Sequence, residues 1–252
     1  STWIWNELSP SIKFSMEQEK KGRNLLKSMG IKEGEEFVII HLREKHYYEE
    51  QIDKSLNREA SEDFDQRNPK IHTYLKAIKF LLGKNIKVIK TGFPGSNCDI
   101  KLNGFIDYAN NFRTEFGDIY LHAFAKFVIS GAAGNFQLAH IFGTPSILTN
   151  SYDYEVKPQL YNDMILPVVY KNNLTNKLCN FKYVLQKGIE ISSSQFLNTH
   201  SLSLIPNNEE EIFYAVKEML ENIRNENTYL NNDEQNYQNI FNSMYDKEHI
   251  GY

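Results

Sequence analysis

The sequence predicts an α/β fold in which a mostly parallel β-sheet is flanked by helices. Short apolar runs of strand length recur along the chain, and helical patterns stand between them. Glycine follows several of these runs, as expected where a strand turns sharply into the next element. The clearest example spans residues 118–149, where strand, small-residue turn, helix and strand follow one another within about thirty residues, the length of one βαβ unit.

The composition describes a globular protein with a substantial core. Of the 252 residues, 41% are hydrophobic and 13% aromatic, which is ample at this length. The formal net charge of −4 argues against a general nucleic-acid-binding protein. No apolar run approaches the ~18 residues of a membrane-spanning helix, and the N-terminus lacks the basic-then-apolar order of a signal peptide. We therefore expect a cytoplasmic protein, at most peripheral at the inner face of the membrane.

Neither a metal ion nor another cofactor is expected. Cys98 and Cys179 are too few for a disulfide framework or a zinc site, and neither has a second ligand at metal-binding spacing. Asp63 and Asp65 form an Asp-x-Asp pair, but it falls in a long charged stretch and is only a weak indication of metal dependence.

The chain begins with a predicted lead-in helix and a buried strand. Residues 10–29 carry apolar side chains at helical spacing, and Gly30 follows them as a helix end. Residues 35–43 form the clearest strand, with His41 and Arg43 where it leaves the core. Alternate side chains of a strand share a face, so both would lie together at the carboxyl end, where parallel sheets bind ligands. The alternative for Arg43 is an ion pair with one of the acidic residues that follow it.

A second strand–helix–strand pattern follows a long loop at residues 45–69. Arg67 and Asn68 stand at the end of that loop, before a helix predicted over residues 71–82. Tyr74 lies on the inner face of this helix, where ordinary core packing is the favoured explanation. The next strand, at residues 86–92, ends in Lys90, Thr91 and Gly92.

The next predicted strand, at residues 104–109, carries Asp107 at its exit. This carboxylate could orient a sugar hydroxyl, or it could equally cap the turn that follows. A helix is predicted over residues 116–125, with Asp118 as a helix-start residue.

The turn after the strand at residues 127–131 is the most suggestive stretch of the chain. Gly131, Ala132, Ala133 and Gly134 have almost no side chain, so a ligand could approach the main chain and receive its N–H groups. A helix is predicted to follow over residues 135–142; its start would favour a phosphate, and its apolar coverage predicts that it is buried rather than half exposed. The alternative is a tight turn whose small residues serve only packing.

The rest of the chain has weaker patterns. Gly143 ends the helix and a strand follows at residues 146–149, after which residues 151–170 carry Pro158 and Pro167 around an apolar run. A helix is expected within residues 174–185, with Gly188 after it. Two further helices are predicted. The first is capped by residues 207–210, with Glu210 in the reciprocal position, and the second covers residues 234–245 with an apolar stripe that packs on the sheet, formed by Tyr237, Ile240, Phe241 and Met244.

Residues 132–145, AAGNFQLAHIFGTP, resemble the donor-site signature of GT-B glycosyltransferases, especially that of bacterial heptosyltransferases. The similarity extends to bacterial glycosyltransferase-like proteins in which a His-x-Arg strand, an Arg-Asn-x-x-x-x-x-Tyr helix and a basic residue with glycine precede the signature. Here these are residues 41–43, 67–74 and 90–92. Ala132 and Ala133 replace the hydroxyl residues usual in relatives, and Gln137 stands at the heptosyltransferase histidine.

The resemblance implies a Rossmann-like domain of the GT-B C-terminal-half type with a helical tail. Its predicted boundaries are residues 1–33 for a lead-in, 34–205 for the nucleotide-sugar-binding domain and 206–252 for C-terminal helices packed on it. It also implies a connecting loop at residues 151–170, and that a complete protein carries a second, N-terminal Rossmann-like half.

The implied activity is transfer of a sugar from a nucleotide-diphosphate donor, as co-substrate, to a glycan or lipid-linked acceptor. The donor diphosphate would contact Arg67, Asn68, Lys90, Thr91, Gly92, Ser130, Gly131, Ala132, Ala133, Gly134, Asn135 and Gln137. Catalytic candidates are His41, Arg43 and Asp107, with Glu44 as a further candidate base. Arg43, Arg67 or Lys90 would stabilise the leaving group in place of a metal. The alternatives are a nucleotide-sugar epimerase or hydrolase, and a non-catalytic sugar-nucleotide-binding module.

Overall fold

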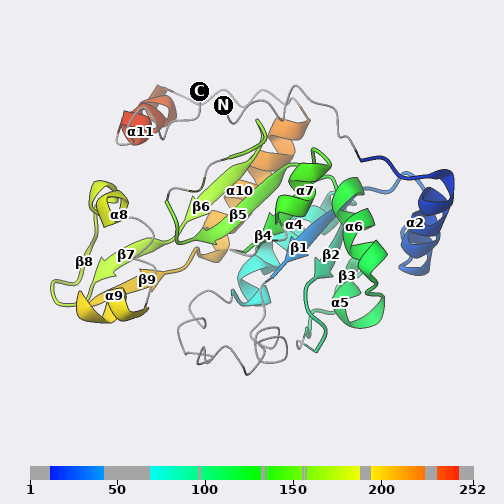
Figure 1. Ribbon diagram of the computed structural model, residues 1–252, viewed down its shortest axis with the longest axis horizontal. Helices are drawn as coiled ribbons and strands as arrows, with labels where there is room; N and C mark the ends of the chain where they lie inside the picture. The colour runs from blue at the N-terminus through cyan, green and yellow to red at the C-terminus, as the bar shows by residue number, and fades with distance from the viewer. Residues whose placement is uncertain are drawn as a thin grey trace.

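The computed structural model describes residues 12–42, 69–95, 98–131, 134, 136–154, 156, 158–187, 194–224 and 232–243 (Figure 1). The first half of the described chain contains α2 (Met16–Ser28), β1 (Phe37–His41), η3 (Ile71–Tyr74), α4 (Leu75–Gly83), β2 (Lys87–Thr91), β3 (Phe105–Asp107), α5 (Tyr108–Asn111), α6 (Glu115–Phe124) and β4 (Val128–Ser130). The second half contains α7 (Phe136–Ile141), β5 (Ser146–Ser151), β6 (Met164–Pro167), β7 (Val169–Asn172), β8 (Lys177–Leu178), α8 (Phe181–Lys187), α9 (Ser194–Thr199), β9 (Leu202–Ile205), α10 (Glu209–Ile223) and α11 (Asn232–Ser243).

The main sheet is six-stranded, in the order β3-β2-β1-β4-β5-β6, and every neighbouring pair in it is parallel. This confirms the predicted α/β class with a parallel sheet and helical tail. From β1 the chain adds β2 and β3 on one side of the sheet, and then adds β4, β5 and β6 on the other side. The direction in which strands are added therefore reverses between β1 and β4. Sheets of this kind bind ligands outside the carboxyl ends of the strands at such a reversal.

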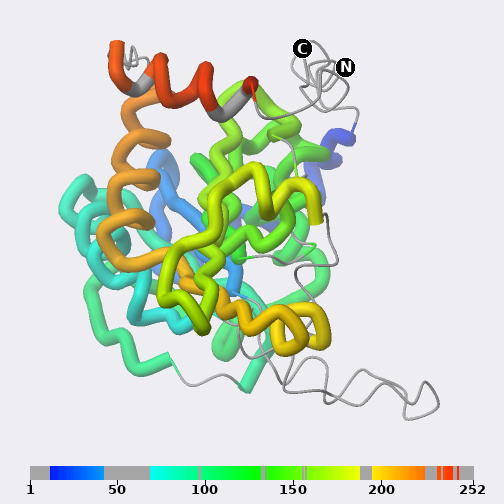
Figure 2. Tube along the Cα trace, turned by 90° about the vertical axis from the view of Figure 1, so that its left-hand side faces the viewer, coloured from blue at the N-terminus to red at the C-terminus, as the bar shows by residue number. Residues whose placement is uncertain are grey.

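Helices cover both faces of the sheet (Figures 1 and 2). Val38 and Ile40 of β1 belong to the core cluster shared with α4 and α10, whereas Phe37 and Ile39 belong to the cluster shared with α2, α5, α6 and α7. Alternation along β1 thus places its side chains in two separate cores, as expected for a strand buried on both faces. None of the described helices is long and apolar enough to cross a bilayer.

The lead-in helix α2 is capped at both ends, and the glycine at its carboxyl end was predicted. Ser15 and Gln18 form a reciprocal cap, in which each side chain accepts the other residue's backbone N–H. At the other end, Gly30 has a φ of 77°, and the Ile31 N–H donates to the carbonyl of Leu26. This left-handed glycine ends the helix as predicted.

A region predicted as a connecting loop contains strands instead. Residues 164–167 form β6, which extends the main sheet, and the chain continues directly into a three-stranded sheet, β8-β7-β9, with antiparallel pairing. The helix expected within residues 174–185 begins only at Phe181, because residues 173–176 form the turn between β7 and β8. The predicted helix end at Gly188 lies outside the described residues.

The predicted burial of α7 is wrong, because this helix is half exposed. Ala139 and His140 are buried, but Gln137 lies on the surface and Ile141 is 39% exposed. The neighbouring elements cover only the face of α7 that touches β4, β5 and α6. The predicted helix end at Gly143 is confirmed by its φ of 72°.

The last two helices are present, with corrections of detail. Helix α10 is capped by Asn208 with Glu211 as its reciprocal partner, one residue later than predicted. Tyr237 and Ile240 of α11 are 71% and 45% exposed, so these two side chains do not pack on the sheet as expected. Phe241 and Met244 lie outside the described side chains.

Candidate functional site

The carboxyl ends of β1, β2 and β4 bring several predicted site residues together. His41 ends β1, and the strand register pairs it with Thr91 of β2 on one side and Ser130 of β4 on the other. The Nδ1 atom of His41 lies 3.1 Å from Thr91 Oγ1, in a buried hydrogen bond. Lys90 is also buried, and Gly92 follows β2 with a φ of 139°, a conformation that favours glycine. This group lies at the reversal of strand order.

The imidazole of His41 is neutral over the physiological range. Burial, followed by the electrostatic effects of His122, Lys90 and Arg113, lowers the pKa of His41 from 6.5 to about 3. The ring of His122 lies 6.4 Å from that of His41, centroid to centroid. Burial also lowers the pKa of His122, although its contact with the Asp118 carbonyl opposes this. A neutral His41 can hydrogen-bond a ligand but has little affinity for a proton.

The turn after β4 is held from several sides. The Gly131 N–H donates to the carbonyl of His41 at 3.1 Å, and the Ser130 hydroxyl donates to the Gly131 carbonyl at 2.8 Å. A methyl group on Gly131 would stand 3.2 Å from the ring of Pro69, so the backbone here is closely approached. The expectation that this turn offers its main-chain N–H groups to a ligand is therefore corrected at Gly131, whose N–H is already bonded. Gly134 and Gln137, predicted to contact the donor, lie on the surface.

A buried polar network that the sequence did not predict adjoins this turn. Tyr74 OH lies 2.7 Å from Thr149 Oγ1, which donates to the carbonyl of Ser130 at 3.1 Å. The Asn150 amide and Asn207 extend the network toward α10. The Tyr74 ring packs in the core as the sequence indicated, but its hydroxyl has a specific partner. Thr149 ends the strand predicted at residues 146–149 and Asn150 follows it, so two polar residues at the end of an apolar run were the available signal.

Asp107 serves as a helix cap. Its carboxylate accepts the Asn110 backbone N–H at 3.4 Å and the Asn110 side-chain amide at 2.6 Å, at the start of α5. Its strand β3 is two positions from β1 in the sheet. The capping role that the sequence left open is thus present, and a catalytic role for Asp107 stays a prediction.

Ser146, His140 and Asp163 form a second buried polar cluster. His140 Nε2 lies 3.0 Å from Ser146 Oγ and 3.0 Å from Asp163 Oδ2, so a single ring nitrogen meets both partners. A hydrolytic triad requires the carboxylate and the hydroxyl on opposite nitrogens of the imidazole. The carboxylate also accepts the backbone N–H groups of Ser146, Gln159 and Leu160, which is typical of a structural anchor.

Several predicted site residues lie outside the described residues. They are Arg43, Glu44, Asp63, Asp65, Arg67, Asn68, Ala132, Ala133 and Asn135. The described part of the chain contains no group of three or more His, Cys, Asp or Glu side chains arranged to hold a metal ion.

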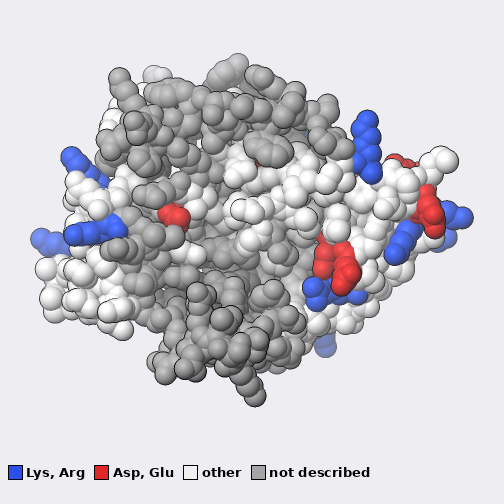
Figure 3. All heavy atoms as spheres, in the orientation of Figure 1, with Lys and Arg blue, Asp and Glu red and all other residues white. Residues whose placement is uncertain are grey.

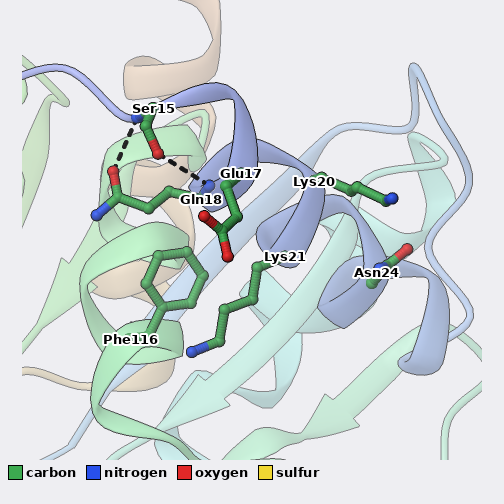
Figure 4. Close-up of a pocket in the computed structure, with 7 residues that line it drawn as sticks. All are labelled: Ser15, Glu17, Gln18, Lys20, Lys21, Asn24 and Phe116. Carbon is green, nitrogen blue, oxygen red and sulfur yellow. Dashed lines mark hydrogen bonds between the residues drawn. The ribbon is translucent and has the colours of Figure 1, made fainter.

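An open hollow on the surface lies away from these residues. It is lined by residues of α2 and its cap, with Phe116 of α6 opposite them, and Figure 4 shows Ser15 and Gln18 hydrogen-bonded in the helix cap. Since none of the predicted site residues lines this hollow, we place the candidate site at the carboxyl edge of the sheet. In Figure 3 the charged side chains that can be seen lie toward the small-sheet end of the face and on the side of α6 and α2.

Comparison with known proteins identifies the fold. No protein-family model matches the chain, and a search of curated proteins found no match. Among solved structures, the chain is similar to a glycosyl transferase family 9 protein from Veillonella parvula, with a TM-score of 0.50 and 9% identity, over 83% of this chain and 53% of that one. It also matches the Escherichia coli ADP-heptose lipopolysaccharide heptosyltransferase II, with a TM-score of 0.42 and 11% identity, over 63% of this chain and 45% of that one.

The chain therefore has a GT-B-type α/β fold, as predicted. The similarity to the Veillonella parvula protein, which covers 83% of this chain, carries this assignment. The chain spans about half the length of these two structures.

Proposed function

We propose that this chain is the donor-binding half of a GT-B-type glycosyltransferase, which transfers a sugar from a nucleotide diphosphate to a glycan or lipid-linked acceptor. The observation that carries this proposal is the pairing of His41 with Thr91 and Ser130 at the point where the strand order reverses. Ligands of open parallel sheets bind at that point. The fold shared with a glycosyl transferase family 9 protein and the motif at residues 132–145 support a nucleotide sugar as the ligand.

The electrostatics of this edge suit an anionic ligand. Lys90 and Arg113 both lower the pKa of His41, which means that their positive charges raise the potential at the end of β1. Positive potential at a site attracts a diphosphate and lowers the free energy of its bound state. In this proposal Lys90 acts together with Arg43 and Arg67, and no metal ion is required to stabilise the leaving group.

A non-catalytic sugar-nucleotide-binding module is the second candidate. An effective general base has a pKa near the working pH, and the pKa of His41 is about 3. Asp107 holds the start of α5. His41 is therefore not ready to accept a proton in this structure, and the Asp107 carboxylate is engaged in a helix cap, which favours either a module that only binds the donor or a base supplied from outside the described residues.

The test begins with a binding screen. Nucleoside diphosphates and nucleotide sugars are added to the full chain, and the melting temperature is followed, since a ligand that binds only the folded state raises it. We expect a selective shift with one base. No shift with any of them, in a folded sample, would refute a donor site.

Turnover then separates the two candidates. The nucleotide sugar that binds is incubated with glycan and lipid-linked acceptors, and the released nucleoside diphosphate is measured with and without acceptor. Acceptor-dependent release supports the transferase, release without acceptor supports a hydrolase, and binding without release supports the module.

The predicted arginines can be tested in the same assay. Arg43→Ala and Arg67→Ala should each weaken binding of the nucleoside diphosphate by about 1.5 to 3 kcal/mol, as expected for a lost charged hydrogen bond. Unchanged calorimetric affinity in both variants would remove them from the site.

A further inference from the structure

Strand β5 departs from regular geometry beside the turn after β4. Its register with β6 shifts between Leu148 and Ser151, and Asn150 has a φ of 54°. A left-handed residue inside a strand is strained and persists only where its surroundings hold it. Such strain often occurs at functional sites.

Asn207, just before α10, holds Asn150 in this conformation. The Asn150 backbone N–H donates to Asn207 Oδ1 at 2.6 Å, and the Asn207 N–H donates back to Asn150 Oδ1 at 2.8 Å. The remaining amide group of Asn207 donates to the carbonyl of Pro167 at 3.0 Å. The bulge is therefore fixed by Asn207, a residue distant in sequence, which accepts the Asn150 backbone N–H.

The side chains beside the bulge form a hydrogen-bond chain with a defined direction. A carbonyl can only accept, so the Thr149 hydroxyl must donate its proton to Ser130 O. Thr149 Oγ1 then accepts from Tyr74 OH, which in turn accepts from the Asn150 amide at 3.5 Å. Burial raises the pKa of Tyr74 to about 12, so the phenol keeps the proton that it donates. Tyr74 and Thr149 are fully buried.

The end of this chain is the peptide group between Ser130 and Gly131. Its carbonyl accepts from Thr149 of β5, and its N–H donates to the carbonyl of His41 of β1. A peptide group is planar, so bonds to both of its ends fix its orientation and the direction in which the chain enters the turn. This peptide stands at the reversal of strand order, where the donor is proposed to bind.

We propose that Thr149 is a positioning residue for the donor site: its hydroxyl fixes the Ser130–Gly131 peptide and so sets the turn against which the donor diphosphate binds. This inference rests on the proposed function. Thr149 does not itself touch the ligand, and it acts through the peptide that it holds.

The test compares two substitutions at the same position. Thr149→Val keeps the shape of the side chain and removes the hydroxyl, whereas Thr149→Ser keeps the hydroxyl. Each variant is titrated by calorimetry with the nucleoside diphosphate that binds the unaltered chain best, at a temperature where all the proteins are folded. We expect T149V to raise Kd by about fivefold or more, the effect of a lost buried hydrogen bond, and T149S to stay within about twofold.

Ser146→Ala provides a matched control. It removes another buried hydroxyl of β5, but one that contacts His140 and Asp163 and not the turn. This variant should lose stability and keep the Kd of the unaltered chain. Equal weakening in S146A and T149V would show a general effect of destabilisation and overturn the inference.

The remaining outcomes separate this inference from the proposed function. An unaltered chain that binds none of the nucleoside diphosphates refutes the donor site, and the positioning role falls with it. Binding by the unaltered chain with an unchanged Kd in T149V refutes the positioning role alone. If T149V does not fold, Thr149→Ala replaces it, because it also removes the hydroxyl that donates to the Ser130 carbonyl, and an unchanged Kd there equally refutes the positioning role.

Discussion

Replacing His41 by Asn should remove a large part of the acid sensitivity of the fold. In the folded protein the imidazole stays neutral, because burial and the neighbouring charges of Lys90 and Arg113 lower the pKa of His41 to about 3. In the unfolded chain the same imidazole takes up a proton as the pH falls below the ordinary pKa of histidine. The unfolded state then binds more protons, so stability is lost as the pH falls from about 6.5 toward about 3.

The size of the effect follows from the two pKa values. Between about pH 7.5 and about pH 4.5, protonation of His41 in the unfolded chain alone costs about 2.5 kcal/mol of stability. This figure changes little if the folded pKa is one unit higher, because the imidazole would still be mostly neutral at the lower pH. Asn at this position retains an amide that can reach Thr91, and it does not titrate.

The assay is urea unfolding followed by far-UV circular dichroism at both pH values. We expect the loss of unfolding free energy between them to be smaller in His41→Asn by about 2.5 kcal/mol. Thr91→Val is the control, since it removes a hydrogen-bond partner of His41 but keeps the imidazole, and it should leave the loss as in the unaltered chain. The same pH dependence in His41→Asn as in the unaltered chain would refute the buried, neutral imidazole.

Substitutions at three further positions test other features. Asp163→Asn should cost about 3 kcal/mol at neutral pH. Burial raises the pKa of Asp163, but the hydrogen bond and charge interaction with a histidine, together with the backbone N–H partners, lower it overall. The difference in unfolding free energy between Asp163→Asn and the unaltered chain should therefore shrink below about pH 4. Urea unfolding at several pH values measures this difference. Gly22→Ala should lower the melting temperature and reduce the free energy of unfolding by about 2 to 3 kcal/mol, because the new methyl would stand 2.1 Å from the ring of Tyr120. An unchanged melting temperature would show that α2 and α6 separate easily. Asp107→Asn should keep the cap of α5, whereas Asp107→Ala should reduce the free energy of unfolding by about 1 kcal/mol, measured by thermal unfolding. If Asp107 serves only as a cap, any turnover by Asp107→Asn equals that of the unaltered chain.

The central part of the fold could be predicted because its signals are local. Strand β1 reads as an apolar run, and its two faces follow from alternation alone. The helix ends at Gly30 and Gly143 follow from the left-handed conformation that glycine adopts most easily. Pairing of His41 with its neighbours then follows from the shared carboxyl edge of parallel strands.

What the sequence missed depends on long-range contacts. Strands β7 and β9 pair across about thirty residues of chain, and each has only four residues, too few for a clear alternating pattern. The sequence predicts the cap of α10 one residue early, because Asn207 and Asn208 are equally good caps in isolation. Asn207 is instead bonded to Asn150, which no local pattern could indicate.

The candidate site combines positive potential, a fixed turn and an imidazole, that of His41, which is not ready to accept a proton. Lys90 supports the potential, Thr149 and the His41 carbonyl hold the Ser130–Gly131 peptide, and the imidazole of His41 has little affinity for a proton. An anion that binds beside His41 would raise the pKa of this imidazole, since it stabilises the charged form. Donor binding would therefore move His41 toward the range in which a general base works. Histidine titration by NMR with and without the bound nucleoside diphosphate distinguishes the two cases: a rise in the His41 pKa supports a catalytic role that the unliganded site conceals, and an unchanged pKa leaves the proton acceptor to be supplied from outside the described residues.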